Sequence, residues 1–492
     1  MSLFDTIERW GNRLPHPVFL FLWLSLLIAV ISFIASQMQV SYVLPGEEEQ
    51  YVQNLLSPEL FRQWLGGSMN AFLSFPPLGI VVVASIGVGL ADASGLLRYV
   101  LQRLVKKTGT WQLPASILAL GIVSNVVGSV GYIVLIPLAC RAYQAAGRPP
   151  LAGLATAFAG VAGGTHATIF VTTYDVAISG ITTSAAQLID PDYVVSPLAN
   201  YFFMSASVLL LVVVGTLVSL KVVEKRLHKL RPSQALSNEF TVTVRKQDDK
   251  AMLLAGILFI SIVLFFVLSA ILPNGWLAPY EGQPLGRSEV MNGLPLIIAI
   301  AFGLSGITYG FVSGSFKSER DLLKACQKSL GQLSLFLLII FVASQLIYLF
   351  KLSQLSGVLA VSVNEQLSDL TLHPAILMIA VVLLSAFLNL FMGSPVVQWS
   401  VMAPVLIPSL FFVGLPLEVT QAAFRIGDSV TNIISPLFGY LGLILATAQD
   451  YDENAKLGTL MSLMLPFSLT FLLTWTTLLV VWVYLLELPI GL

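Results

Sequence analysis

Charge is the property that this sequence has least of. Charged residues make up 10% of the 492 residues, whereas an average soluble domain carries roughly 25%. Hydrophobic residues make up 56%, and the mean hydropathy is +0.86. Runs of roughly 20 apolar residues recur along the chain, which is the length a helix needs to cross a bilayer. The composition therefore excludes a soluble globular protein and predicts an all-α polytopic membrane protein.

Cysteines and catalytic motifs are also scarce. Cys140 and Cys326 both fall near the predicted cytoplasmic side, where a disulfide is not expected. The sequence has no His-Glu-x-x-His, no Gly-x-Ser-x-Gly and no phosphate-binding loop. We therefore predict that the chain is not an enzyme, binds no nucleic acid, and holds no cofactor beyond a bound sodium ion.

Apolar runs that end at charges or at Pro and Gly breaks predict the membrane spans. Full-length spans are expected near residues 17–38, 70–94, 199–220, 251–272, 293–313, 331–350 and 459–485. Two stretches, 150–182 and 417–447, are apolar but interrupted by Gly, Thr, Asn, Ser and Asp, which predicts broken helices. Two more, 113–140 and 374–412, are too long for one span, since 28 residues of helix measure about 42 Å against a hydrocarbon core of about 30 Å.

Lysine and arginine indicate that each of these long stretches returns to the side it came from. Basic residues flank 113–140 at both ends, whereas the flanks of 374–412 are poor in them. With 113–140 and 374–412 as re-entrant hairpins, the chain has nine transmembrane helices, a cytoplasmic N-terminus, and 21 of its 25 Lys and Arg residues on the cytoplasmic side. This asymmetry matches the positive-inside rule and predicts a multi-pass protein of the bacterial inner membrane.

The two halves of the chain repeat the same order of elements. Gly128-Ser129 precedes Pro137 and then Gly147, and Gly393-Ser394 precedes Pro404 and then Gly414, with ten residues from Pro to Gly in both copies. Because the copies start in opposite directions, we predict an inverted repeat, which is typical of secondary transporters. The predicted divisions are 1–69 (N-terminal helix and external loop), 70–220 (first repeat), 221–330 (basic cytoplasmic loop and connecting helices), 331–485 (second repeat) and 486–492 (C-terminal tail).

Few charges fall inside the predicted spans, and each is a candidate for function because burying a charge in hydrocarbon is costly. Arg425 and Asp428 are three residues apart, so on a helix they share a face and can form an ion pair. The break at Ser429–Pro436 follows directly and exposes carbonyl groups that suit a hard cation, while Arg425 can grip a substrate carboxylate. The alternative is a buried ion pair that only holds the helix in register.

The first broken stretch offers a second polar site. Asp175 follows a predicted break at Gly163–His166 and can bind a cation, carry a proton or recognise substrate; alternatively, it caps a half-helix. His166 can titrate near physiological pH, or it fills a helix break. We assign ion or proton coupling to polar residues at the breaks and hairpin tips: Asp175, Asp428, Asn125, Ser129, Thr165, Ser394 and Asn432. The candidate sodium ligands are Asn389, Asp428 and Asn125.

Several motifs resemble the AbgT family of p-aminobenzoyl-glutamate transporters. They are Trp10-Gly-Asn-Arg-Leu-Pro-His-Pro17, Asp175-Val-Ala-Ile-Ser-Gly180, Trp399-Ser-Val-Met-Ala-Pro404, Phe424-Arg-Ile-Gly-Asp-Ser429 and Ala455-Lys-Leu-Gly458. The resemblance spans nearly the whole chain and implies a homodimer with a hairpin-containing fold. It implies a role for Asp175 and a substrate site made of Asn389, Gly393, Trp399, Pro416, Arg425 and Asp428. The first hairpin tip departs from the pattern, because Gly128-Ser129 carries no carboxylate where relatives have an aspartate.

These observations predict a secondary active transporter. The expected substrate is p-aminobenzoyl-glutamate or a related aromatic carboxylate, with Arg425 binding the charge and Trp399 the ring. Export of sulfonamide antimetabolites and coupling to sodium or protons are part of this expectation, and membrane lipid is the expected surrounding partner. The alternatives are an ion-coupled importer of C4-dicarboxylates or other organic anions, a channel, and a membrane-embedded enzyme.

Overall fold

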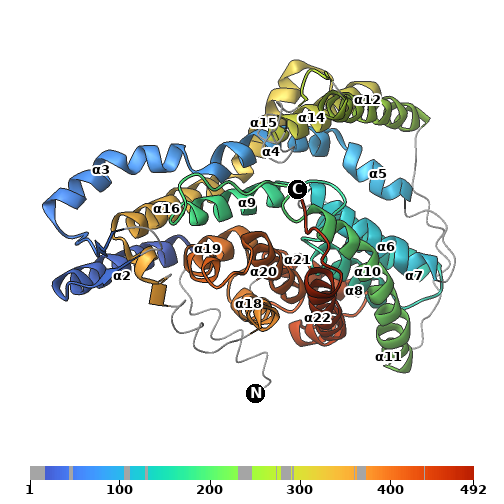
Figure 1. The fold of residues 1–492 in the computed structure, drawn as a ribbon. Coiled ribbons are helices and arrows are strands. Elements are labelled where there is room, and N and C mark those ends of the chain that lie inside the picture. Colours follow the sequence, from blue (N-terminus) through green and yellow to red (C-terminus); the bar gives the residue numbers. More distant parts are fainter. Residues whose placement is uncertain are drawn as a thin grey trace.

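The protein is described by a computed structural model that is almost entirely helical. It describes residues 17–43, 48–104, 111–127, 131–230, 246–272, 274–278, 290, 293–359, 361–362, 373–436 and 438–492. The one sheet in this part of the chain is a pair of antiparallel two-residue strands, β1 (Ser41–Tyr42) and β2 (Gln50–Tyr51). The predicted all-α class is confirmed, and Figure 1 shows the helices.

The helices divide into those of the two predicted repeats and those of the elements that connect them. The first repeat runs through α4 (Pro76–Ser94), α5 (Leu96–Leu104), α6 (Gln112–Ser124), the 3₁₀ turn Asn125–Val127, the π-helical turn Gly131–Leu135, α7 (Ile136–Ala145), α8 (Pro150–Val161), α9 (Thr173–Ala186) and α10 (Tyr201–Val218). The second runs through α16 (Ser334–Leu352), α18 (Pro374–Asn389), α19 (Pro395–Phe411), α20 (Leu417–Asn432), α21 (Leu441–Gln449) and α22 (Leu457–Val480). Outside them lie α2 (Pro17–Gln37), α3 (Pro58–Leu73), α12 (Lys246–Ile271), α14 (Leu294–Ser313) and α15 (Glu319–Gln332). The π-helical turn Ser219–Val223 extends α10 and leads into α11 (Glu224–Leu230). The π-helical turn Val481–Leu485 extends α22.

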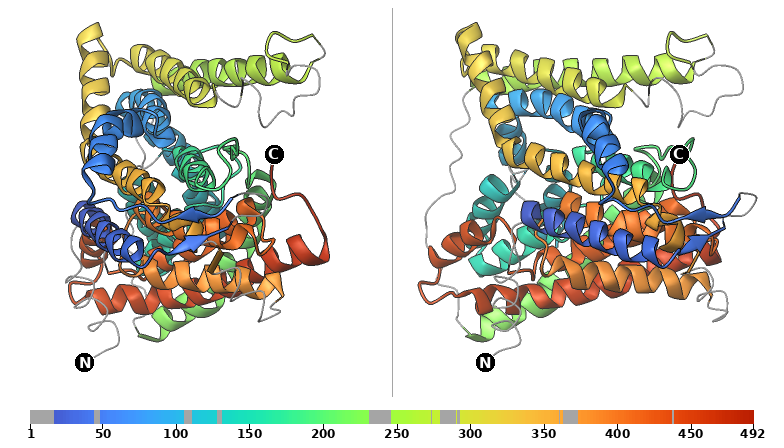
Figure 2. Two further views of the ribbon diagram at one scale, coloured as in Figure 1. Left: turned by 60° about the vertical axis from the view of Figure 1, so that its left-hand side comes forward. Right: turned by 90° about the vertical axis from the view of Figure 1, so that its left-hand side faces the viewer.

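Among the described residues, four continuous helices are long and apolar enough to cross a membrane: Tyr201–Leu227, Gln247–Ile271, Leu294–Ser313 and Leu457–Leu485. The predicted span 70–94 differs from the structure, because Pro76 and Pro77 begin a new helix and leave α3 as a separate element. Proline lacks the N–H that would continue the preceding helix, which explains the break. Figure 2 shows α12 and α14 as a paired arm at one edge of the molecule, and α14 packs against α4.

Each hairpin packs against a broken helix through a glycine. A Cβ on Gly160 of α8 would lie 2.8 Å from the carbonyl oxygen of Leu118 in α6. A Cβ on Gly427 of α20 would lie 2.6 Å from Cβ of Ser385 in α18. Both distances are shorter than side chains tolerate, so glycine allows the two backbones to approach closely. The same device therefore joins hairpin and broken helix in both repeats.

The second halves of the broken helices exchange partners. Whereas α8 packs on α6 and α7, its continuation α9 packs on α19 of the other repeat. Likewise α20 packs on α18 and α19, and its continuation α21 packs on α7. The repeats are therefore interlocked, and the two helix breaks lie where they cross. This reciprocal packing agrees with the predicted inverted repeat.

Contacts at the hairpin ends agree with the predicted sidedness. Before the first hairpin, the Tyr99 hydroxyl donates to Asp249 at 2.6 Å, and after it Arg148 donates to Glu224 at 2.6 and 2.9 Å. Asp249 and Glu224 both belong to the predicted basic loop at 221–250. In the structure these two residues are helical, in α11 and α12, so both ends of the hairpin contact the helices that border the middle of the predicted loop.

The second hairpin is tied to the opposite set of helix ends. The ring of His373, before it, lies 5.3 Å from the ring of Tyr484 near the C-terminus. The backbone carbonyl of Glu418, after it, accepts from Asn200 at the start of α10, at 2.7 Å. Phe203 of α10 in turn donates its N–H to Ile490 at 3.1 Å. These contacts join both ends of the second hairpin to the ends of α10 and α22 that are predicted to be external.

Impermeant thiol labelling tests this arrangement. In a Cys140→Ala/Cys326→Ala background, Trp111→Cys and Ala146→Cys should react only from the cytoplasmic face, because they flank the first hairpin. His373→Cys and Val413→Cys, which flank the second hairpin, should react only from the external face. The measurement compares labelling of intact cells with labelling of inside-out vesicles. Reaction of either pair from two different faces would contradict the hairpins.

Candidate functional site

One face of α20 carries a row of buried polar side chains. Gln421, Arg425, Asp428 and Asn432 follow one another at spacings of four, three and four residues, which place them on the same side of a helix. None of the four is more than 3% exposed. The helix ends at Asn432, and the chain is non-helical until α21 begins at Leu441. Four polar groups buried at a helix end need partners from elsewhere in the fold.

The first broken helix supplies the facing side chains. It loses regular structure after Val161 and resumes as α9 at Thr173. Asp175 closes this segment with a capping box, in which one carboxylate oxygen accepts from the Thr172 N–H at 2.6 Å and from its hydroxyl at 2.7 Å. His166 lies in the non-helical stretch and is completely buried.

Two contacts between the broken helices hold the site together. Arg425 forms an ion pair with the second carboxylate oxygen of Asp175. The His166 Nε2 and Asp428 Oδ2 atoms lie 3.1 Å apart, within hydrogen-bond distance. Both contacts join residues more than 200 positions apart in the sequence. They stabilise the crossing of the two repeats.

The expected pair of Arg425 with Asp428 is wrong. The two residues do share a face of α20, but each side chain turns to its own partner on the first broken helix. Asp175 does take part in capping α9, and the same carboxylate also binds Arg425. A spacing of three residues shows only that two side chains can meet, not that they do.

The tip of the second hairpin closes the site from a third side. The amide of Asn389 donates to the Asp428 carbonyl at 2.7 Å and to the Asn432 side-chain oxygen at 2.9 Å. Asn432 reaches back to Asp428 Oδ2 at 3.3 Å and to the Ala162 carbonyl at 3.5 Å. The hairpin tip and the two breaks therefore meet around Asp428.

Several buried atoms at this junction have no hydrogen-bond partner. Among the described residues seven buried side-chain N and O atoms are unpartnered, and four of them are His166 Nδ1, Asn389 Oδ1, Arg425 Nε and Asp428 Oδ1. Leaving such a group unpaired costs about 1–3 kcal/mol. Because native proteins pair nearly all of these groups, a cluster of exceptions indicates a place that receives a ligand. Two carbonyl-type oxygens, one guanidinium N–H and one imidazole nitrogen are available there.

Other predicted residues make local contacts or lie apart from this cluster. Asn125 donates back to the carbonyl of Ile122 at 3.2 Å, and Thr165 donates to that of Ala162 at 2.7 Å. Gly393 and Ser394 lie in the turn that precedes α19. Pro416 is exposed at the start of α20, twelve residues or about 18 Å along the helix from Asp428. Ser129 lies outside the described residues.

Trp399 is fully buried in the structure. Its ring stacks on Phe424 at 4.4 Å, and its indole N–H donates to the Thr182 hydroxyl at 2.9 Å. Phe424 precedes Arg425 in the sequence, but adjacent residues of a helix do not face each other, so this stacking does not by itself place the indole beside the guanidinium.

Two amides and a hydroxyl of this network were not among the residues predicted from the sequence: Asn200, Gln421 and Thr182. Gln421 could have been found, because it lies one turn before Arg425 on the same face. Asn200 gives no such signal, since it precedes an ordinary apolar helix.

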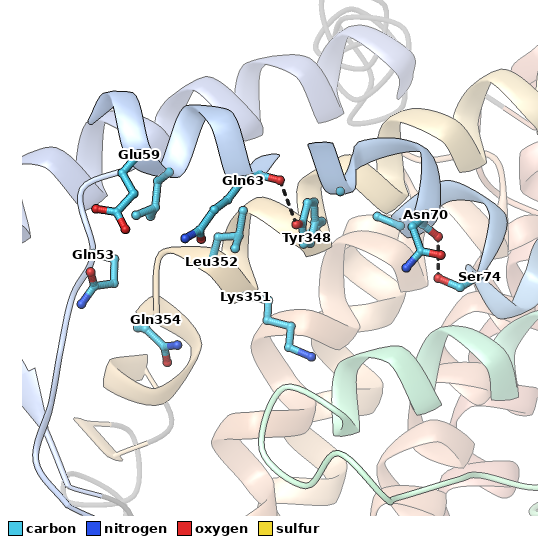
Figure 3. A pocket seen from close by; sticks show the side chains of 12 residues that line it. Gln53, Glu59, Gln63, Asn70, Ser74, Tyr348, Lys351, Leu352 and Gln354 are labelled. Atoms are coloured by element: carbon cyan, nitrogen blue, oxygen red, sulfur yellow. Dashed lines mark hydrogen bonds between the residues drawn. The ribbon is translucent and has the colours of Figure 1, made fainter. Parts of the chain in front are cut away.

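The described residues contain no group of three or more His, Cys, Asp and Glu side chains that could hold a metal. A cavity of about 540 Å³ lies between α3 and the end of α16 (Figure 3), lined by polar residues that include Glu59, Asn70 and Lys351. None of the predicted site residues lines it. The cavity is open and distant in sequence from the buried cluster, so we place the site at the crossing of the broken helices.

Broken helices, paired hairpins and a buried charged junction in an apolar helical fold define a polytopic membrane transporter. The model of the AbgT putative transporter family matches residues 2–492. This chain belongs to the AbgT family, which is a family of transporters and not of enzymes.

Relatives agree along the full length of the chain. The p-aminobenzoyl-glutamate transport protein of Escherichia coli (strain K12) is 31% identical over 491 residues, which cover 100% of this chain and 96% of that protein. The crystal structure of the Alcanivorax borkumensis YdaH transporter matches with a TM-score of 0.91 and 36% identity, over 97% of this chain and 100% of that one. The structure of Neisseria gonorrhoeae MtrF, described as illuminating a class of antimetabolite efflux pumps, matches with a TM-score of 0.91 and 36% identity, over 100% and 99% of the two chains.

The glycine contact behind the site gives a stability prediction. Gly427→Ala should destabilise the protein by about 1–3 kcal/mol, because the new methyl group would meet α18 at Ser385 and Ala386 and force the hairpin away. The measurement is thermal unfolding in detergent. Gly442→Ala is the matched control, since a Cβ there has nothing within 4 Å. Equal unfolding temperatures for the two variants would refute the close approach.

Proposed function

We propose that this chain is a secondary active transporter of p-aminobenzoyl-glutamate or a related aromatic carboxylate in the bacterial inner membrane. The activity named for the Escherichia coli relative supports this substrate, and the description of the Neisseria gonorrhoeae relative supports export of antimetabolites such as sulfonamides. A cytoplasmic N-terminus and a homodimer surrounded by lipid complete the proposal. The supporting features are the distribution of basic residues and the large apolar side chains exposed on α2, α3 and α12.

The observation that carries the proposal is the group of unpartnered atoms at the crossing of the broken helices. Arg425 binds Asp175 through one end of its guanidinium, and its Nε has no partner. A substrate carboxylate fits a planar guanidinium through two parallel hydrogen bonds. It would therefore compete with Asp175 for Arg425, and substrate binding would act directly on a contact between the two repeats.

Coupling to an ion is assigned to the other half of the site. Asp428 Oδ1 and Asn389 Oδ1 are buried, unpartnered oxygens of the kind that a hard cation binds. The hydrogen bond between Asp428 and His166 offers a proton site at the same place. Asn432 contacts Asp428 and could assist the binding of either ion. The remaining candidates for ion or proton coupling come from the sequence: Asp175, Asn125, Ser129, Thr165 and Ser394. The remaining candidates for substrate binding also come from the sequence: Gly393, Trp399 and Pro416.

A C4-dicarboxylate importer is the second candidate function, because a guanidinium recognises any carboxylate. Trp399 stacks on Phe424, the residue before Arg425 on α20, and this aromatic pair favours a substrate that also carries a ring. Competition between succinate and p-aminobenzoyl-glutamate for the purified protein distinguishes the two.

Loss of the carboxylate at position 428 should uncouple transport. We expect Asp428→Asn to lower gradient-driven flux of p-aminobenzoyl-glutamate at least about tenfold, since the amide has no negative charge to balance a cation and no proton to release; tenfold in flux corresponds to about 1.4 kcal/mol. The measurement uses proteoliposomes under separately imposed sodium and proton gradients. Asp192→Asn, at an exposed aspartate, is the control. Undiminished flux in Asp428→Asn would remove this residue from coupling.

The guanidinium at position 425 should select for charge on the substrate. Arg425→Lys retains a positive charge but loses the planar donor pair, so the KM for p-aminobenzoyl-glutamate should rise about tenfold or more. Transport of an aromatic amide without carboxylates should change much less. The comparison of KM values between the two substrates is the readout. Equal losses for both would indicate that Arg425 has only a structural role.

A further inference from the structure

Asn200 breaks a local rule of helix capping. It stands at the N-cap position of α10, where an asparagine side chain usually accepts a hydrogen bond from the first turn of its own helix. In this structure the side chain makes no such bond, although it is only 1% exposed. A capping group that is diverted from its own helix indicates a use elsewhere.

All side-chain contacts of Asn200 go to the broken helix α20. Its amide donates to the Glu418 carbonyl at 2.7 Å. Its oxygen accepts from Gln421 Nε2 at 2.8 Å and from Arg425 Nη1 at 3.3 Å. Because one bond is donated and two are accepted, the orientation of the amide is fixed. The Oδ1 atom of Asn200 is therefore the one that faces the guanidinium.

A chain of hydrogen bonds connects this amide to the second hairpin. The Gln421 oxygen accepts from the Thr182 hydroxyl of α9 at 2.6 Å, and the Thr182 oxygen accepts from the Trp399 indole at 2.9 Å. Every member of the chain is at most 1% exposed. The chain therefore sets the position of the guanidinium relative to the aromatic pair of Trp399 and Phe424.

The charge of the partners decides what Arg425 can do. Asp175 lies on one side of the guanidinium, and the neutral amide of Asn200 lies on the other. A second carboxylate in place of Asn200 would keep the hydrogen bond but offset the positive charge. The neutral acceptor thus holds Arg425 in place and leaves its charge available for an anionic ligand.

We propose that Asn200, held by Gln421, is a positioning residue that directs Arg425 and thereby determines the preference of the site for carboxylate-bearing aromatic substrates. This inference rests on the proposed function, because it concerns how the same site selects its substrate. It extends the site from the two broken helices to α10, an unbroken helix.

The test compares two ligands that differ only in charge. One is p-aminobenzoyl-glutamate, and the other is the same molecule with both carboxylates converted to carboxamides. Binding of each to the purified full-length protein is measured by isothermal titration. The wild-type preference for the charged ligand tests the proposed function, and the change of that preference in a variant tests the role of Asn200.

We expect Asn200→Asp to weaken binding of the charged ligand about tenfold or more and that of the carboxamide less than about twofold. The aspartate keeps the acceptor toward Arg425 and Gln421 but loses the donor to the Glu418 carbonyl, so the ratio of the two affinities, and not either affinity alone, reports on the charge available at Arg425. Gln421→Met, which removes the donor that orients Asn200, should reduce the preference in the same direction. Ser207→Ala is the control on the same helix: its hydroxyl accepts from Trp475 at 2.8 Å, remote from Arg425 in the hydrogen-bond network.

An unchanged ratio in Asn200→Asp, or equal losses for the two ligands, would overturn the inference while leaving the proposed function in place. A wild-type protein that binds both ligands equally would overturn the proposed function and the role of Asn200 with it. Thermal unfolding of each variant shows whether a loss of binding comes from misfolding; a folded Asn200→Asp protein with the expected ratio supports the inference.

Discussion

Backbone that leaves a helix inside a membrane must find partners within the protein, and this constraint organises the structure. Two helices break at the centre of the fold, and polar side chains from the facing segment surround each break. Asp175 caps one half-helix and binds Arg425 of the other broken helix, while Asn432 reaches the carbonyl of Ala162 in the first break. The breaks therefore stabilise each other, and neither repeat would be satisfied alone.

Close packing of the hairpins depends on the same crossing. Glycines at 160 and 427 bring each hairpin against the broken helix of its own repeat, and the half-helices α9 and α21 then reach the hairpins of the opposite repeat. Each hairpin therefore contacts segments of both broken helices. Asn389 at the tip of the second hairpin donates directly to the Asp428 carbonyl, so this hairpin also contacts the broken helix at the polar cluster.

The fold could be predicted from the sequence because the elements of a membrane protein are visible as patterns along the chain. Apolar length, Gly and Pro breaks, and the distribution of Lys and Arg indicated both hairpins and both broken helices. The partners of Arg425 and Asp428 could not be predicted from such patterns. Helical spacing showed that the two residues share a face, but Asp175 and His166 come from a segment more than 200 residues earlier. Asn200 was missed because its role comes from a diverted side chain and not from its place in any motif.

The charges of the site suggest why substrate and ion would share one binding event. Arg425 is the one buried cation in this junction whose charge does not depend on pH, and Asp175 and Asp428 are its two buried carboxylates. A substrate carboxylate that takes the guanidinium from Asp175 adds a third negative charge to a low-dielectric space. An uncompensated charge there is costly, so a cation or a proton at Asp428 would lower the cost of substrate binding. By thermodynamic linkage, binding of the substrate would favour binding of the cation or proton, and the reverse. The substrate would replace the ion pair between Arg425 and Asp175, which joins the two broken helices. This same ion pair would have to change for the site to open to the other side of the membrane.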